Sequence, residues 1–442
     1  MKQIIKPLLS ILISFLFVNP IAKSQSELVF NTIDSLFSYA ENNSYSIKNG
    51  EQQMLLAKWQ QISAKAGIVN FRMQTSFSLT NNLELPVTYL PAEAFGGTPG
   101  TFKEITTGQQ YIGNFNIAPQ IDIINPASWA KLKSANINAS LTQVNNLIAK
   151  KSLFESISAC YFNIISLKEQ STITQNTLQI ADTIVLILQN KYNEGQVRQQ
   201  DLNDAIINQL SLKDKLNQLN LSLNQQYASL KILCDIPENT KLIIEHKLDY
   251  NQAFSLNNPV NNALEYRSSL LKAELAKSDL KTSNLSQLPT LSFVLYDAWQ
   301  QNSTETFFDK DTQWRNSQYI GLRLSLPFPD INKYILSKNA KINKKMTLLN
   351  AEHTQLQNNL ANSQLEMDYS KAYSQFKTSK QIYQLKEDNY HMAMHQFKMS
   401  ILSSDRLLIA FNDLLASRLN YSSALANLLY TKSKIDINNT IK

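Results

Sequence analysis

Hydrophobic side chains recur every three or four residues along two very long stretches of the chain. This spacing is typical of helices that pack against each other along a coiled-coil seam. Residues 127–236 contain no proline and one glycine, Gly195, and residues 330–442 contain neither. The sequence therefore predicts helices of roughly 60 residues or more before a break, each about 90 Å long, in an elongated molecule. Two examples of the spacing are Ile137, Leu141, Val144, Ile148 and Leu216, Leu219, Leu223, Tyr227, Leu230.

Four shorter stretches alternate apolar and polar residues with a period of two, which indicates strands with one apolar and one polar face. Each is long enough to span a membrane, since a tilted strand needs about 9–11 residues. A soluble two-faced sheet shows the same alternation, so the strands alone leave both interpretations open. The stretches are Phe71–Thr80, Tyr111–Ile123, Leu291–Trp299 and Ile320–Phe328.

The order of these elements occurs twice: helix, strand, loop, strand, long helix, break, helix. A turn-rich loop from Glu84 to Gly108 separates the first pair of strands, and a shorter one, about Gln301–Gln313, separates the second. Long loops on one side are typical of outer-membrane barrels. We therefore divide the chain into a first repeat at 25–235, a linker at 236–258 and a second repeat at 259–442.

Four strands are too few to close a barrel, since the smallest filled barrels have about eight. An open sheet edge in lipid would leave backbone groups unpaired at a cost of about several kcal/mol each. If the strands lie in a membrane, several copies must share one barrel, and either two or three copies would satisfy this requirement.

The motifs at the junctions resemble those of the TolC family of outer-membrane efflux proteins. The first helix break reads Tyr192-Asn193-Glu194-Gly195-Gln196-Val197, followed by Asp201-Leu202, which looks like the family's turn between helices. Leu288-Pro289 matches its entry from helix to strand, and Gly321–Phe328 resembles its final strand. The resemblance covers nearly all of the chain after residue 24.

The resemblance implies a mainly α-helical fold with a β-barrel part. Long, duplicated coiled-coil hairpins would lie in the periplasm of a Gram-negative bacterium. Four strands from each of three protomers would complete a twelve-stranded barrel in the outer membrane. It further implies a homotrimeric, porin-like exit duct for a tripartite efflux or type I secretion system. The partners would be a periplasmic adaptor protein and an inner-membrane pump or ABC transporter, without nucleic acid and without a cofactor.

The same resemblance places a gate at the periplasmic tip, where both hairpins turn. Gly195 marks the first turn and Asp201 matches an acidic residue that some members use there. In the second repeat Ser400 and Arg406 stand at the corresponding positions, with Asp405 one residue away, so the sequence leaves open whether the second copy contributes to the acidic ring known in some members. Family members close this end partly by contacts between first-copy acids and second-copy basic residues. Two readings stay open: Asp201 pairs with Arg406 or Lys398 and helps to hold the tip shut, or all three are solvated charges on the helix surface.

The N-terminus indicates export. Lys2 and Lys6 precede an apolar run, Leu8–Val18, and Ala22-Lys23-Ser24 is a suitable cleavage site, so residues 1–24 read as a signal peptide. The run is shorter than the roughly 20 residues that span a bilayer. The formal net charge is +7, and three of these charges are lysines in this segment, which gives no strong argument for nucleic acid.

The residues offer little material for catalysis, because the chain has four histidines and two cysteines and lacks the common catalytic motifs. His391 and His395 lie one helical turn apart and could hold a metal ion, but two ligands make a weak site. Cys160 and Cys234 should lie at different heights of one hairpin, which predicts two free thiols.

Two other classes of protein compete with the channel. A periplasmic adaptor or a structural coiled-coil protein would also contain helical hairpins, although adaptors have one hairpin and no duplicated set of strands. An enzyme is disfavoured because the carboxylates are scattered along helices. The nature of the cargo, whether drug, metal ion or polypeptide, does not follow from the sequence.

Overall fold

The structure is a computed structural model that describes residues 27–245, 260, 262–327 and 330–441. The expected signal peptide and most of the expected linker lie outside these residues. The chain forms two compact units, and each unit takes segments from both repeats. We call Gly50–Asn146 with Ala263–Asn358 the sheet unit, and Met1–Asn49 with Leu147–Asn262 and Asn359–Lys442 the hairpin unit.

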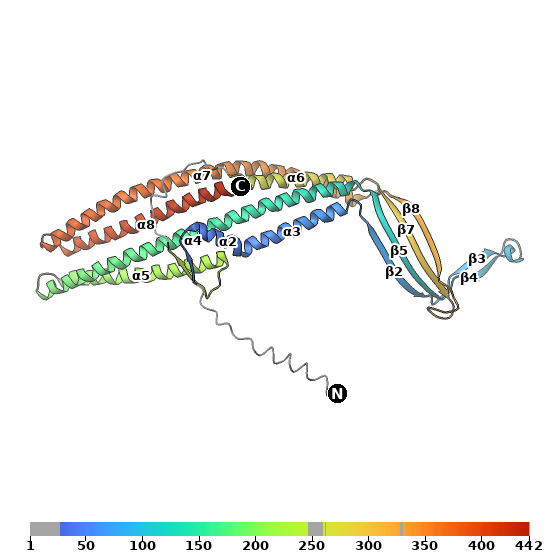
Figure 1. Ribbon diagram of the computed structural model, residues 1–442, viewed down its shortest axis with the longest axis horizontal. Helices are drawn as coiled ribbons and strands as arrows, with labels where there is room; N and C mark the ends of the chain where they lie inside the picture. Colours follow the sequence, from blue (N-terminus) through green and yellow to red (C-terminus); the bar gives the residue numbers. More distant parts are fainter. Residues whose placement is uncertain (1–26, 246–259, 261, 328–329, 442) are drawn as a thin grey trace, which may run out of the picture. The chain divides into compact units, whose positions relative to one another are not determined.

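The sheet unit contains one four-stranded antiparallel sheet in the order β2-β5-β7-β8 (Figure 1). All four predicted strands are present, although the last begins at Arg315, five residues before the predicted start, and ends at Ser325. β2 is Arg72–Asn81, β5 is Tyr111–Ile124, β7 is Thr290–Ser303 and β8 is Arg315–Ser325. The outer strands β2 and β8 each have one edge that pairs with no other described strand.

The long loop after β2 holds a structure that the sequence pattern does not reveal. β3 (Val87–Pro91) and β4 (Phe102–Thr106) form a separate two-stranded hairpin, joined by the short helix η1 (Ala92–Phe95). The loop had been expected to consist of turns, because it is rich in proline and glycine.

Four helices complete the sheet unit as a single layer, in the order α3, α4, α6, α7. α3 is Tyr45–Ala66 and α6 is Leu264–Leu285, while α4 (Pro126–Asn193) and α7 (Ile331–Lys398) contribute their first turns. Polar contacts join neighbours: Gln61 bonds Asn136 between α3 and α4, and Ser134 bonds Asp279 between α4 and α6. Ser337 bonds Asn284 between α7 and α6.

Local signals explain where the two longest helices begin. Pro126 is the first residue of α4, a position where its missing N–H costs no helical hydrogen bond. Asp330 precedes α7 and accepts a bond from the backbone N–H of Lys333 at 3.1 Å, which caps the helix. Both helices span 68 residues, as expected for stretches without internal proline or glycine.

The hairpin unit is built from two antiparallel helix pairs, visible in Figure 1 as α5 beside α4 and α8 beside α7. α5 is Gln199–Cys234 and α8 is Ser404–Thr440, and α2 (Ile33–Asn43) packs on α4 through stacked Phe37 and Phe154 rings. The buried Ser158 and Ser433 hydroxyls bond at 2.8 Å and join α4 to α8.

A small parallel sheet also belongs to the hairpin unit. β1 (Glu27–Phe30) pairs with β6 (Lys241–Ile244), which lies in the segment expected to be a linker. Both strands are only four residues long, so neither produces a clear periodic signal in the sequence.

The two repeats are in register along their helices. Pro126 and Ile331 start helices of equal length, Asn193 and Lys398 end them, and both pairs of residue numbers differ by 205. The same offset relates Gly195 to Ser400 and Asp201 to Arg406, as the sequence comparison of the two breaks predicts.

Both cysteines are free thiols, which agrees with the prediction. Cys234 is buried, and this burial, helped by the nearby Asp235 and Cys160, raises the pKa of its thiol to about 12. Among the described residues, no helix combines the length and the apolar character needed to cross a bilayer.

Candidate functional site

One face of the four-stranded sheet is apolar and open. The pairing register places Leu322 opposite Phe293, and Phe293 opposite Ile121, so apolar residues of adjacent strands share this face. Its side chains are largely exposed on β8, with Leu322 at 67% and Ile320 at 70%. Exposed apolar rows of this extent are unusual on a sheet that faces water. We call this the apolar face of the sheet.

The opposite face carries mostly small or polar residues, and we call it the polar face. Several of its side chains are buried, including Ser292 at 3% and Val294 at 8% exposure. The buried residues of the polar face lie on the central strands β5 and β7, whereas the polar residues of β2 and β8 are exposed. A soluble protein would normally bury its apolar rows, which here are open on β2 and β8.

A network centred on Asp122 ties the helix-side end of the polar face together. Its carboxylate accepts bonds from Asn70 at 2.5 Å, Ser292 at 2.8 Å and Asn125 at 3.1 Å. It also forms an ion pair with Arg72 at 3.1 Å. These partners come from the α3–β2 turn, β2, β7 and the β5–α4 turn, so one carboxylate joins four segments. Sequence analysis did not single out Asp122, because its partners are up to 170 residues away.

The loop end of the apolar face is covered by the loop after β7. Phe308 stacks near Phe77 and Trp314, with ring centroids 6.2 and 6.4 Å away. A Cβ at Gly113 would lie only 3.2 Å from the Trp314 ring, so glycine lets the indole ring approach the strand closely. Gln301 binds the carbonyls of Asp309 and Thr312 beneath this cover.

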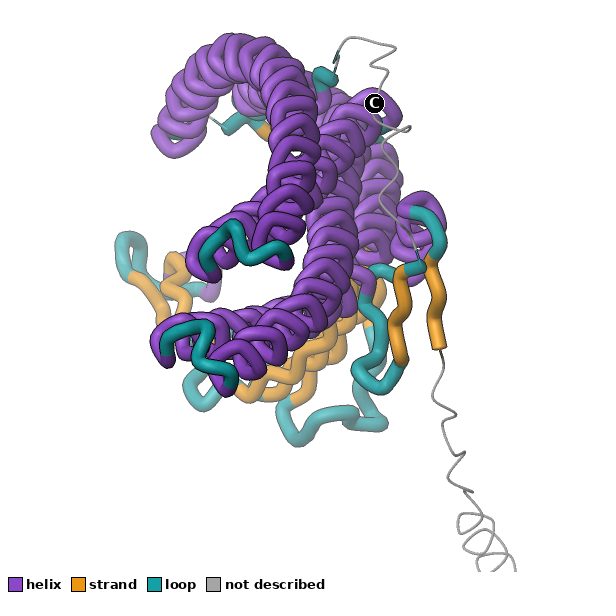
Figure 2. The backbone as a smooth tube through the Cα atoms, turned by 90° about the vertical axis from the view of Figure 1, so that its left-hand side faces the viewer, coloured by secondary structure: helices purple, strands orange, loops and turns teal. Residues whose placement is uncertain are grey.

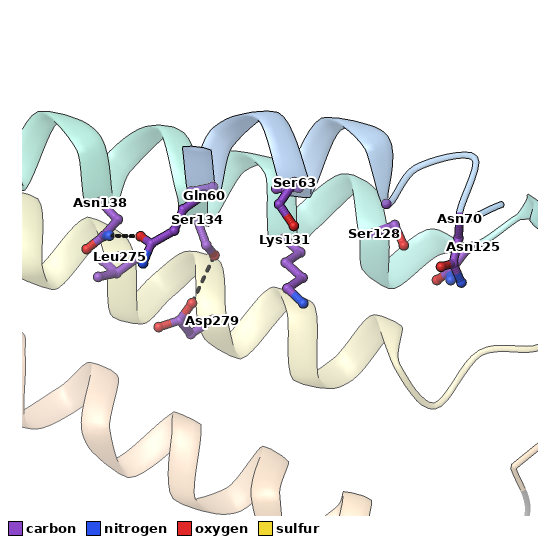
Figure 3. A pocket seen from close by; sticks show the side chains of 13 residues that line it. Gln60, Ser63, Asn70, Asn125, Ser128, Lys131, Ser134, Asn138, Leu275 and Asp279 are labelled. Carbon is purple, nitrogen blue, oxygen red and sulfur yellow. Dashed lines mark hydrogen bonds between the residues drawn. The ribbon is translucent and has the colours of Figure 1, made fainter. Parts of the chain in front are cut away.

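A recess of about 710 Å³ lies between α3, α4 and α6 in the sheet unit (Figure 3). Its walls carry amides and hydroxyls, with Lys131 and Asp279 as charged groups. Gln60 and Asn138 bond across it at 3.1 Å. Asn70 and Asn125, which both bind Asp122, lie at one end, so the recess adjoins the network just described.

The two helix hairpins turn side by side, and Figure 2 shows both turns nearest the viewer. After α4 the N–H of Gly195 bonds the carbonyl of Tyr192 at 2.9 Å, and Gln196 bonds Lys191 at 2.8 Å. After α7 the N–H of Ser400 bonds Phe397 at 2.9 Å, and that of Ile401 bonds Gln396 at 2.9 Å. Both turns are Schellman motifs, which need a left-handed residue.

Lys191 links the two turns. Its ammonium lies 3.4 Å from the Ser400 hydroxyl and 4.9 Å from the centre of the Phe397 ring. Next to this contact a hydrophobic core joins all four helices, and it includes the fully buried Leu188 and Leu407. The hairpins are therefore held together by apolar packing, while the turns themselves meet through polar contacts.

The four residues expected at the gate lie in this region. Gly195 and Ser400 occupy the left-handed positions, with φ of +67° and +60°. The Asp201 carboxylate accepts the backbone N–H of Arg198 at 3.0 Å and so caps the start of α5. No ion pair joins Asp201 to Arg406 or Lys398 within the described part of one chain, and a pair between copies stays a prediction.

A cleft of about 700 Å³ opens between the turns. Its lining is mostly polar and includes Arg198, Asp201, Asp204 and Asp405. The Ser403 hydroxyl and nearby backbone N–H groups hold the pKa of Asp405 below its ordinary range. Lys191, which lines the same cleft and joins the turns, was missed by sequence analysis, since nothing in its local pattern distinguishes it from other helix-surface lysines.

His391 and His395 lie on the exposed surface of α7. Across the described residues, no group of three or more His, Cys, Asp or Glu side chains could hold a metal ion. The pair thus lacks the third ligand that a stable site would need.

No family model matches the sequence, and no curated protein is similar to it. Solved structures do match. The outer membrane protein VceC from Vibrio cholerae is 17% identical, over 92% of this chain and 94% of its own, with a TM-score of 0.71. The Campylobacter jejuni outer membrane channel CmeC is 16% identical, over 92% of this chain and 85% of its own, with a TM-score of 0.71.

CusC, described in connection with transmembrane channel formation, gives a TM-score of 0.75 at 12% identity and covers 95% of both chains. At these identities the likeness shows the fold. The chain has the TolC-like channel fold, with duplicated helical hairpins and four strands, and the predicted fold class is confirmed.

Proposed function

We propose that this chain is one protomer of an outer-membrane exit channel, a passive duct without catalytic activity. The observation that supports this best is the two-faced sheet, which leaves the apolar rows of β2 and β8 open and carries polar residues on its opposite face. A lipid bilayer around the sheet would satisfy the apolar side chains, and water inside a channel would satisfy the polar ones.

The free sheet edges support a shared barrel. β2 and β8 each keep one edge unpaired among the described strands, and in lipid such an edge would leave backbone groups unsatisfied. Pairing β8 of one copy with β2 of the next closes the sheet, and three copies give twelve strands. Three copies is the number that the family resemblance implies.

The outermost helices of the sheet unit support the same assembly. α7 exposes Ile342, Met346 and Leu349, and α3 exposes Leu55, Trp59 and Ile62. Both series advance by steps of four and three residues, which is the spacing of a coiled-coil seam. The α7 seam of one copy can therefore pack on the α3 seam of its neighbour.

In this proposal the hairpins lie in the periplasm and the turns near Gly195 and Ser400 form the gate. A periplasmic adaptor protein and an inner-membrane pump or ABC transporter would supply the cargo to this end. The channel would serve a tripartite efflux or type I secretion system.

Membrane fractionation and planar-bilayer recording together test the proposal. We expect the protein in the outer-membrane fraction as a trimer that resists detergent, and we expect discrete conductance steps from the purified trimer. A monomer recovered from the periplasm, with no conductance, would instead favour an adaptor or a structural coiled-coil protein.

A further inference from the structure

We infer that the wall of the pore formed by the polar face of the sheet favours anions, so that anionic solutes are the class it admits most readily. This inference rests on the proposed function, because it takes the polar face as the lining of a water-filled pore. It adds the sign of the charge that the pore selects.

The charges on the polar face can be assigned from the strand register. Arg72 and Asp122 lie on this face, and so do Arg315, opposite Gln300, and Arg323, opposite Ser292. Every other residue of the four strands on this face is uncharged. The strands thus contribute three arginines and one carboxylate to the wall.

The single carboxylate on the wall is already neutralised. Asp122 pairs with Arg72 and accepts three further side-chain bonds at 3.1 Å or less. Arg315 and Arg323 form no ion pair with any residue that the structure describes, and both are exposed. Two uncompensated positive charges therefore remain per chain.

Assembly would not neutralise these two arginines. The strand that β8 would meet in a neighbouring copy is β2, and β2 contains no Asp or Glu. The only other carboxylate in the four strands is Asp297, which the register places on the apolar face, where it accepts a bond from Asn316 at 2.6 Å. The pore wall keeps its positive charge in the trimer.

Asp309, in the loop after β7, belongs to the other side of the sheet. Asp309 accepts a bond from Ser303, and Ser303 pairs with Tyr111 on the apolar face. The cover formed by Phe308 and Trp314 lies on that face as well. The Asp309 carboxylate therefore lies away from the wall that carries Arg315 and Arg323.

The test is the reversal potential of the reconstituted trimer across a tenfold gradient of potassium chloride in a planar bilayer. We expect chloride to be more permeant than potassium. The double variant Arg315→Gln with Arg323→Gln should lower the chloride-to-potassium permeability ratio by roughly twofold at 0.1 M salt, where the Debye length is about 10 Å. Arg315→Glu with Arg323→Glu, which turns two positive charges per chain into two negative ones, should reverse the preference.

Asp297→Asn is the matched control, because it changes one charge on the apolar face and should leave the ratio unchanged. A wild-type channel that prefers potassium, as expected if Glu84 and Glu104 of the long loop govern entry, would overturn the inference and leave the channel assignment intact. An unchanged potential in the double variant would overturn it equally. Absence of any conductance would remove the proposed function and this inference with it.

Discussion

The two hairpin turns have almost the same backbone but are made from different residues. Gly195 and Ser400 both adopt left-handed φ angles, and the N–H of each bonds the carbonyl three residues before it at 2.9 Å. Glycine adopts this conformation freely, whereas a residue with a Cβ is strained by roughly 1–2 kcal/mol. The second turn therefore keeps the geometry against its local preference, which indicates that the packing of the hairpins fixes it.

The helices that follow the turns differ in charge at equivalent positions. The third residue of α5 is Asp201, which caps the helix, and the third residue of α8 is Arg406. In α8 the acid moves to the second position, Asp405, and still benefits from the helix dipole. The repeats thus share a backbone and a favourable helix start, while the N3 position carries opposite charges in the two copies.

The largest expected effect comes from placing a charge on the apolar face of the sheet. It tests whether β5 of the first repeat and β8 of the second repeat both turn this face toward lipid. Ile117 on β5 and Leu322 on β8 lie on the apolar face, 205 residues apart. Substituting arginine at either site should cost about 2–4 kcal/mol, because the charge would enter the hydrocarbon region. The yield of detergent-resistant trimers in the outer-membrane fraction measures this cost.

Ser325→Arg on the polar face is the control for these two variants and should assemble nearly as well as the wild type. If Leu322→Arg assembled normally while Ser325→Arg did not, the assignment of the two faces would be reversed. A large loss for Leu322→Arg without a loss for Ile117→Arg would show that the repeats are not equivalent in the membrane.

The Asp122 network breaks the symmetry of the repeats, since the position 205 residues later is Pro327, which has no carboxylate. Asp122→Ala should destabilise the sheet by about 1–3 kcal/mol, because the donors around this buried carboxylate, with the buried Ser292 hydroxyl among them, would lose their acceptor. The temperature at which trimers dissociate on a gel should fall. Asp297→Ala, which removes a carboxylate from the other face, should change this temperature less, and equal losses would contradict a special role for Asp122.

The left-handed residue of each hairpin turn can be replaced to test how much the turn depends on it. Gly195→Ala should destabilise the protein by roughly 1 kcal/mol through backbone strain alone, because no atom lies within 4 Å of the added Cβ. Ser400→Gly should stabilise it by a smaller amount, since glycine removes the strain but loosens the unfolded chain and loses the exposed Lys191 contact. Thermal unfolding followed by circular dichroism measures both. A stabilising effect of Gly195→Ala would mean that the first turn does not need its left-handed residue.

Periodicity revealed the long helices and four strands because these elements are long and repeat their pattern many times. The distribution of proline and glycine placed the first residues of α4 and α7 to within a residue or two, and the duplicated break around Gly195 placed the regions where they end. β1 and β6 were missed, since four residues give little periodicity and the strands pair across more than 200 positions. The β3–β4 hairpin was hidden for a different reason, because its proline and glycine residues suggested turns alone.

The candidate site was only partly accessible from the sequence. The duplicated break predicted the positions of Gly195, Asp201, Ser400 and Arg406. Two repeats that are in register adopt the same backbone conformation at equivalent positions. The roles of Asp122 and Lys191 did not follow, since each depends on partners brought together by the fold. A charged residue on a strand or helix surface carries no local sign of such a partner.

The smallest expected effect concerns the opposite charges of Asp201 and Arg406. Exposed ion pairs contribute about 0–1 kcal/mol, which suits a gate that a partner must open. We expect Asp201→Ala to raise the frequency of channel opening, most strongly at low salt, where screening is weakest. Single-channel recording in a planar bilayer measures this frequency.

The structure shows that alanine alone cannot decide this point, because the Asp201 carboxylate also caps α5 through the N–H of Arg198. Asp201→Asn keeps an oxygen that can accept this bond but removes the charge, so it separates helix capping from pairing between copies. If the charge matters, Asp201→Asn and Arg406→Gln should both open the channel more often, and the two effects should not add in the double variant. Opening in Asp201→Ala alone would assign the effect to the cap. An unchanged opening frequency in both Asp201→Asn and Arg406→Gln would show that this pair does not hold the gate closed. A contact that closes the channel must change the opening frequency when either charge is lost.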